Sequence, residues 1–378
     1  RRALHPAQAV ARAGAVTRIA SLAFLATIAC GAPAPQAIAQ GPTPAGSRIY
    51  VTNQENASVS ILDGASGALV QTLDLRTLGF SENAKPHDAA VEPDGSHWYV
   101  TLIGENRILK LNRNDAIVGF VTTPVPGLLA LAPDADVLYA ARSMSAVNPP
   151  ASFVAIRRSD MTLVEEVDVL VPRPHAIETT RDGRYVYVAS LAQNRLIAFD
   201  MQTGVAQIVD VEGPTHTIVE LGLSPDGRWL ASTAQLTGNL FMWDLGNPAR
   251  PVLAHTIPVG QSPWHPTFTR DGCEIYVPNL DANTVSVVDV RRGAVSATIT
   301  DERFAQPHGS TVGPNGWIYV TNRNQAGDAH DHEGHEGAGV GRVVAIDPAT
   351  RQIVASHSTG RYSAGVGSAA SYTGSACR

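Results

Sequence analysis

Histidine recurs at one position of a repeated pattern in this chain. His87, His175 and His308 each follow a proline, and each precedes an Asp or Asn of a turn by seven residues. Two more, His265 and His216, lie near the corresponding position of two other repeats. Neutral imidazoles that converge from several strands are ligands that copper and zinc accept. The spacing therefore predicts a copper or zinc site where these strands meet.

These histidines also have a purely structural interpretation. A histidine at the start of a buried strand can donate a hydrogen bond to a backbone carbonyl of a neighbouring strand, and a preceding proline fixes the local backbone. On this interpretation the chain binds no metal, and the residue pattern alone leaves both alternatives open.

A second histidine-rich feature lies between two of the expected strands. Residues 329–337 contain His330, His332 and His335 together with three acids. We expect an outer metal-capture loop on the same face as the other histidines, and a solvated loop that binds metal only adventitiously is the alternative.

Two carboxylates accompany the histidines. Asp88 directly follows His87, and Glu220 lies near the start of the corresponding strand in another repeat. A histidine with a carboxylate can serve acid–base catalysis, so a lactonase-like or lyase-like enzyme, or an oxidoreductase, is an alternative function. The sequence has no nucleophile elbow, phosphate-binding loop or dinucleotide-binding motif. It also lacks the CxxCH motif, so covalent c-type haem is not expected, and the catalytic residues of any enzyme stay unassigned.

The elements that would position these side chains follow a period of about 44 residues. The turn residues are separated by 40, 48, 44, 45 and 44 positions, and they are Asp94, Asp134, Asp182, Asp226, Asp271 and Asn315. This period is typical of a propeller blade of four antiparallel strands. In the fourth repeat we expect strands at residues 176–180, 185–190, 195–200 and 206–211.

The first repeat lacks its innermost strand. Residues 48–53, 57–63 and 69–75 read as the outer three strands of a blade, and residues 362–370 can supply the missing one. Closing the ring in this way removes exposed sheet edges. We therefore predict an all-β fold, a seven-bladed β-propeller of four-stranded antiparallel blades over residues 47–370, followed by a tail, 371–378. The starts of the inner strands and the loop at 329–337 then share the face at one mouth of the central channel.

The N-terminal segment differs in composition. Arginines precede an apolar run at residues 19–29, and Ala37-Ile38-Ala39 has the small-residue pattern of a signal cleavage site. A helix needs about 20 residues to span a bilayer, and this run is shorter. We expect an export signal at residues 1–39, a linker at 40–46, a periplasmic or secreted product, and no membrane span after signal removal.

The charge of the chain limits the kinds of partner that it could bind. Without residues 1–39, which hold four arginines and no acids, 24 basic and 34 acidic residues leave a net charge of −10. Nucleic acid is therefore not an expected partner, because its binding depends on phosphate neutralisation. A monomer is expected, and a metal-free scaffold for another periplasmic or cell-envelope protein is an alternative function.

Cys273 and Cys377 remain after export, and the sequence does not show whether they pair.

Short motifs carry a family resemblance. The sequence IYVTN occurs at residues 49–53 and again at 318–322, and it resembles the YVTN repeat family, which includes YncE-like exported propellers. This family is similar in fold to the propellers of nitrous oxide reductase and of the cytochrome d1 haem domain. Nitrous oxide reductase holds copper with histidines at a propeller mouth, and the layout of His87, His175 and His308 resembles that arrangement, although two blades lack the histidine and the full ligand set is not reproduced. Copper and zinc both stay expected metals. The second, cysteine-rich copper domain of nitrous oxide reductase is absent from this sequence, so reduction of nitrous oxide is not expected.

Overall fold

A computed structural model describes residues 47–142, 148, 150–169, 171–325, 339–369 and 377. These residues belong to one compact unit, which covers 40–378. The predicted signal segment, the predicted linker and the histidine-rich loop lie outside the described residues. Within the described part, no helix is long and apolar enough to cross a membrane.

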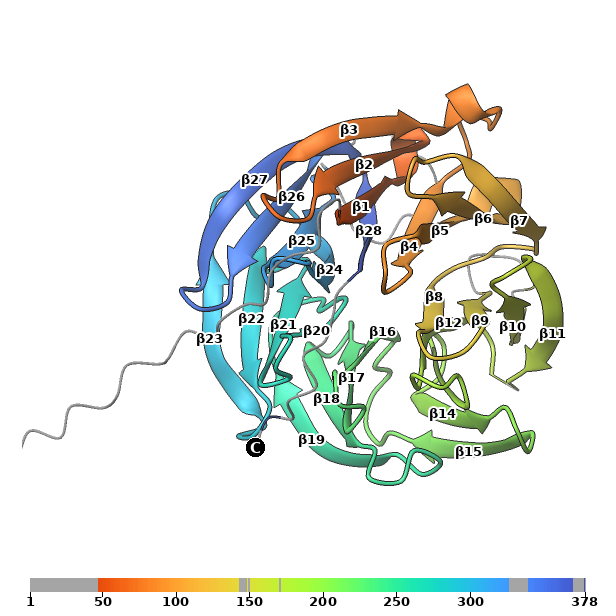
Figure 1. Ribbon diagram of the computed structural model, residues 1–378. Helices are drawn as coiled ribbons and strands as arrows, with labels where there is room; N and C mark the ends of the chain where they lie inside the picture. Colours follow the sequence, from red (N-terminus) through yellow and green to blue (C-terminus); the bar gives the residue numbers. More distant parts are fainter. Residues whose placement is uncertain are drawn as a thin grey trace, which may run out of the picture. The chain divides into compact units, whose positions relative to one another are not determined.

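Seven four-stranded antiparallel sheets make up the fold (Figure 1). The strands of each blade are given from the innermost outward. The first blade consists of β28 (Ser363–Ser368), β1 (Arg48–Asn53), β2 (Ser58–Asp63) and β3 (Leu69–Asp74), and the second of β4 (Pro86–Val91), β5 (His97–Leu102), β6 (Arg107–Asn112) and β7 (Ile117–Thr122). The third blade consists of β8 (Leu129–Ala132), β9 (Val137–Ala141), β10 (Ser152–Arg157) and β11 (Thr162–Asp168). The fourth and fifth are β12 (Pro174–Thr179), β13 (Tyr185–Ser190), β14 (Arg195–Asp200) and β15 (Val205–Asp210); and β16 (Ile218–Leu223), β17 (Trp229–Ala234), β18 (Asn239–Asp244) and β19 (Val252–Pro258). The last two are β20 (Thr267–Phe268), β21 (Glu274–Asn279), β22 (Thr284–Asp289) and β23 (Ala294–Thr300); and β24 (Pro307–Val312), β25 (Ile318–Asn322), β26 (Val340–Asp347) and β27 (Gln352–Arg361). Three short 3-10 helices complete the elements: η1 (Gln54–Asn56), η2 (Leu75–Leu78) and η3 (Ile103–Glu105).

The C-terminal strand closes the ring as predicted. β28 pairs antiparallel with β1, with Ile49 opposite Ser368 and Val51 opposite Val366. Each inner strand contacts the inner strands of both neighbouring blades, from β28 through β4, β8, β12, β16, β20 and β24 back to β28. The seven-bladed, four-stranded architecture expected from the sequence is therefore confirmed.

The hydrophobic core lies between adjacent blades. Tyr187 of β13 and Trp243 of β18 are fully buried in one apolar cluster that joins the fourth and fifth blades. The outermost strands are exposed by contrast, and β15 is accessible along nearly its whole length. Burial between blades stabilises the ring because it removes large apolar side chains from water.

Two strands of the fourth blade differ from the prediction in their bounds. β12 spans 174–179 rather than 176–180, and β15 spans 205–210 rather than 206–211. The early start of β12 comes from a β-bulge, since Pro174 pairs with Ser190 while Ala176 pairs with Ala189 and leaves His175 as an extra residue. A bulge adds one residue to a strand without ending its pairing.

Equivalent bulges recur at the start of other inner strands and explain the threonine of the repeated motif. In three blades a threonine of the second strand, counted from the channel, accepts a hydrogen bond from a backbone N–H within the bulge. The pairs are Thr52 with Gly365 (2.9 Å), Thr101 with Asp88 (3.0 Å) and Thr321 with Gly309 (2.9 Å). The threonine thus satisfies a buried donor that the irregular ladder leaves unpaired.

Candidate functional site

The bulges place histidines around the channel mouth. The rings of His87 and His175 approach edge to face, with centroids 6.1 Å apart. The ring of His308 packs on Trp264 of the preceding blade at 4.1 Å, and the backbone N–H of His265 donates to the carbonyl of His308 at 3.3 Å. Bulges commonly re-aim side chains beside functional sites, and here the predicted residues from four blades gather at one mouth.

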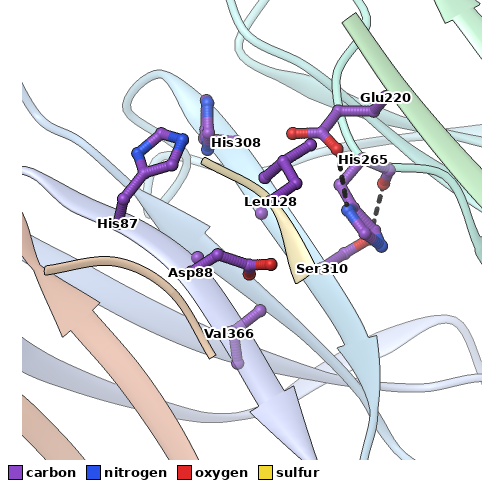
Figure 2. Close-up of a pocket in the computed structure, with 10 residues that line it drawn as sticks. His87, Asp88, Leu128, Glu220, His265, His308, Ser310 and Val366 are labelled. Atoms are coloured by element: carbon purple, nitrogen blue, oxygen red, sulfur yellow. Dashed lines mark hydrogen bonds and ion pairs between the residues drawn. The ribbon is translucent and has the colours of Figure 1, made fainter. Parts of the chain in front are cut away.

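A small cavity opens between these strands. It has a water-accessible volume of about 10 Å³, enough for about one water molecule. Figure 2 shows Asp88 and Glu220 on different sides of this space, with His87 and His308 toward one end and His265 beside Glu220. The strands come close here because Gly365 has no side chain: a Cβ there would lie 2.5 Å from the carbonyl oxygen of His87.

Glu220 and His265 form the one ion pair of the cavity wall among the described residues. The distance between Glu220 Oε2 and His265 Nδ1 is 3.3 Å, and the side chain of Glu220 is only 4% exposed. Burial alone would lower the pKa of His265, but the hydrogen bond and charge of Glu220 raise it above its ordinary value. The pair therefore favours an imidazolium beside a buried carboxylate.

Asp88 is a second acidic group of the cavity. Burial raises the pKa of its carboxyl to about 7, and the hydrogen bond of 2.8 Å that Oδ2 accepts from the backbone N–H of Leu129 opposes this rise only in part. A carboxyl group with this pKa is neutral or charged in comparable amounts at neutral pH, which is the condition for acid–base catalysis.

Sequence reasoning missed a third carboxyl group, Glu178 of β12. Burial raises its pKa to about 7, and the charges of Asp88 and Glu220 contribute in the same direction. Glu178 lies three residues after His175 in a strand whose bulge was not expected. The sequence carries no turn or motif signal that would have identified it.

The protein engages a ring nitrogen of each of the three inner predicted metal ligands, and for His87 the contact is between Nδ1 and Gln54 Oε1 at 3.1 Å. His175 Nδ1 donates to the carbonyl of Val219 at 2.7 Å, and His308 Nδ1 contacts the carbonyl of Ala364 at 3.4 Å. His308 Nε2 accepts a hydrogen bond from the guanidinium of Arg323. Burial lowers the pKa of both His175 and His308, for His308 well below its ordinary range with the Arg323 charge as the next cause. These two rings are neutral, but a cation occupies the position a metal would take on His308.

The structure gives the predicted metal site no support. Among the described residues, no three His, Cys, Asp or Glu side chains are arranged to hold one ion. His216 does not join the cluster: its ring packs on Phe241 at 5.0 Å, and its two nitrogens contact Thr237 and the carbonyl of Glu212 at 2.9 and 3.0 Å. His330, His332 and His335 lie outside the described residues, so the outer capture loop stays a prediction.

Arg323 is the other residue of the mouth that sequence reasoning missed. It directly follows β25, where the chain emerges on the same face as the inner-strand starts, and its side chain is buried with 1% exposure. The Cζ atom lies 4.8 Å from the ring centroid of Trp264 and 4.4 Å from that of Tyr362. Its place directly after the second IYVTN was visible in the sequence, but nothing there indicated a buried cation.

Solved structures similar to this chain are propellers of varied function. A hydrazine synthase chain of Kuenenia stuttgartiensis has a TM-score of 0.60 and 19% identity, covering 75% of this chain and 89% of that chain. A streptogramin B lyase has a TM-score of 0.59 and 16% identity, covering 74% of this chain and 88% of that chain. A functionally unknown protein from Desulfotomaculum acetoxidans DSM 771 has a TM-score of 0.66 and 12% identity, covering 85% of this chain and 98% of that chain. At these identities the likeness concerns the fold alone.

The sequence comparison is more specific. No curated protein matches the chain. The family described as "Lactonase, 7-bladed beta-propeller" matches residues 117–325. This is not the YVTN repeat family that the motifs resemble, so that resemblance is confirmed only at the level of the seven-bladed propeller. Because the match covers more than half of the 378 residues, the chain belongs to the lactonase family of seven-bladed β-propellers.

Proposed function

We propose that this propeller is a hydrolase that opens a small cyclic ester, a lactone, at the channel mouth. The observation that carries the proposal is that Asp88 and the Glu220–His265 pair face one buried cavity with room for a single water. The family match over residues 117–325 supports the choice of a lactone as substrate.

The roles follow from the charge states. Asp88, with a pKa raised to about 7 by burial, accepts a proton from water as the water oxygen attacks the ester carbonyl. The ring C–O bond breaks, and protonated His265, stabilised by Glu220, gives its proton to the departing alkoxide oxygen. The product is a hydroxy acid, and solvent carries the proton of Asp88 back to His265. The cavity is too small for the lactone, so the substrate ring lies above it, toward the mouth.

The test is hydrolysis of a lactone panel. γ-Butyrolactone, δ-valerolactone and glucono-δ-lactone are incubated with the full chain, and acid release is followed at constant pH with EDTA present. Asp88→Asn, Glu220→Gln and His265→Gln are each expected to lower kcat about 100-fold or more. Asp134→Asn is the matched control, because Asp134 forms an exposed ion pair with Arg181 away from the site. No hydrolysis above the buffer rate, or equal rates for Asp88→Asn and Asp134→Asn, would reject the proposal.

The disulfide between Cys273 and Cys377 supports the predicted export of this activity. The two residues are 104 positions apart, and their Cα atoms are 4.9 Å apart. Structural disulfides are common in exported proteins and rare in the cytosol of most organisms. The substrate is therefore one that reaches the periplasm or the medium.

A further inference from the structure

The mouth holds a buried positive charge without a matching negative one. Arg323 is 1% exposed, and among the described residues no carboxylate lies within ion-pair distance of its guanidinium. The carboxylate of Glu220 is paired with His265 instead. An arginine stays charged in nearly all protein environments, so burial of its charge without an opposite charge is unfavourable.

The neighbours of Arg323 do not supply that negative charge. Its guanidinium lies between the aromatic rings of Trp264 and Tyr362, which stabilise a cation through their faces. One nitrogen, Nη2, donates to His308 Nε2. His308 is neutral, because burial and the Arg323 charge lower its pKa. The aromatic ring faces and the neutral imidazole offset part of the free-energy cost of burying Arg323. They do not neutralise its positive charge.

Three buried polar atoms around this cation are donors. Nε and Nη1 of Arg323 are buried without a hydrogen-bond partner, and so is the indole Nε1 of Trp264. A buried donor without an acceptor is costly, and each such atom calls for an explanation, of which a bound water, ion or ligand is one. A group that accepts from several N–H donors and carries a negative charge would satisfy both deficits.

We propose that Arg323 and Trp264 form an anion site for the carboxylate of a hydroxy acid at the channel mouth. This rests on the proposed function, because opening a lactone creates a carboxylate beside the groups that act on the ring. Planar carboxylates match the guanidinium N–H groups, and such charge-assisted hydrogen bonds are among the stronger ones. Trp264 and Tyr362 are 4% and 2% exposed, so these rings part when the ligand enters.

The experiment measures binding without turnover. Unfolding temperature and calorimetric affinity are measured on the full chain with 4-hydroxybutyrate, with 1,4-butanediol as the neutral analogue, and with sodium chloride at equal ionic strength. We expect 4-hydroxybutyrate alone to raise the unfolding temperature. We expect Arg323→Gln to weaken its affinity about 10- to 100-fold, and Trp264→Phe, which keeps an aromatic face and loses the indole N–H, to weaken it less. Arg181→Gln, an exposed arginine, is the control and should bind like the parent.

A second readout separates a ligand site from a structural role. Without ligand, Arg323→Gln should unfold at the same or a higher temperature than the parent, because it removes an uncompensated buried charge. A marked loss of stability without ligand, or equal stabilisation by 4-hydroxybutyrate and 1,4-butanediol, would overturn the anion site. Asp88→Asn should bind 4-hydroxybutyrate while lacking activity. Binding that persists in a chain with no lactone hydrolysis therefore rejects the proposed function and leaves the anion site standing.

Discussion

Glu220 and His265 form an ion pair of 3.3 Å that joins the fifth blade to the sixth. The pair raises the pKa of His265, which burial alone would lower. We expect Glu220→Gln to reverse this balance, so that His265 loses its proton at a lower pH than in the parent. Titration of histidine ring signals by NMR measures the change. An unaltered His265 titration in Glu220→Gln would contradict the assignment of the raised pKa to this pair.

Burial of Asp88 has a consequence for stability against pH. Its pKa is raised to about 7 in the folded chain from 3.8, so the folded state holds a proton that the unfolded state releases. The protonated Asp88 therefore makes its full contribution to the free energy of unfolding below pH 4. This contribution is lost as pH rises through 7, and the free energy falls by up to about 1.4 kcal/mol per pH unit. Glu178 acts in the same direction.

Asp88→Asn removes one of these titrations. We expect the free energy of unfolding of the parent to fall between pH 5 and pH 8 more steeply than that of Asp88→Asn. Urea denaturation at a series of pH values measures both slopes, and Asp134→Asn provides the control. Equal slopes in parent and Asp88→Asn would show that Asp88 titrates near its ordinary pKa.

The fold was predictable because its signals are local and repeated. The aspartate or asparagine turns recur at nearly constant spacing, and the incomplete first repeat required a strand from the other terminus, which β28 supplies. The placement of His87, His175 and His308 at one mouth followed from the same repetition. Each of these conclusions needed only the position of a residue within its own blade.

The chemistry of the mouth was less predictable because it depends on contacts between blades. The cation beside His308 comes from Arg323, 15 residues later in the chain, and the partner of His175 is the carbonyl of Val219 in the next blade. Bulges also change which side chains face the channel. A pattern of residue types predicted ligands that could converge, but not which ring nitrogens the protein itself would engage.

The threonine of the repeated motif can be tested in the second blade. Thr101 is fully buried, and its hydroxyl accepts from the backbone N–H of Asp88 at 3.0 Å. We expect Thr101→Val, which keeps the shape, to lower the free energy of unfolding by about 1–3 kcal/mol because a buried donor loses its partner. Thr122→Val, at an exposed position of β7, is the matched control. Equal stabilities of the two variants in urea denaturation would speak against this role.

Metal binding by the two groups of histidines should be separable. If the chain binds copper or zinc, we expect deletion of residues 328–337 to remove that metal and the double variant His87→Ala, His308→Ala to retain it. The physical reason is that the Arg323 guanidinium occupies His308 Nε2. Equilibrium dialysis with metal analysis gives the stoichiometry of each variant. Loss of metal from the double variant would instead place a metal at the inner histidines.

The disulfide should stabilise the sixth blade and the C-terminal end together. Cys273 lies in the turn between β20 and β21, and its partner Cys377 follows the last described strand by nine residues. The bond closes a loop of about 100 residues, so breaking it increases the entropy of the unfolded chain, with a typical loss of about 2–4 kcal/mol. We expect Cys273→Ser and dithiothreitol treatment of the parent to lower the unfolding free energy by similar amounts. Dithiothreitol should leave Cys273→Ser unchanged, and a parent that is insensitive to reduction would show that the bond does not contribute to stability.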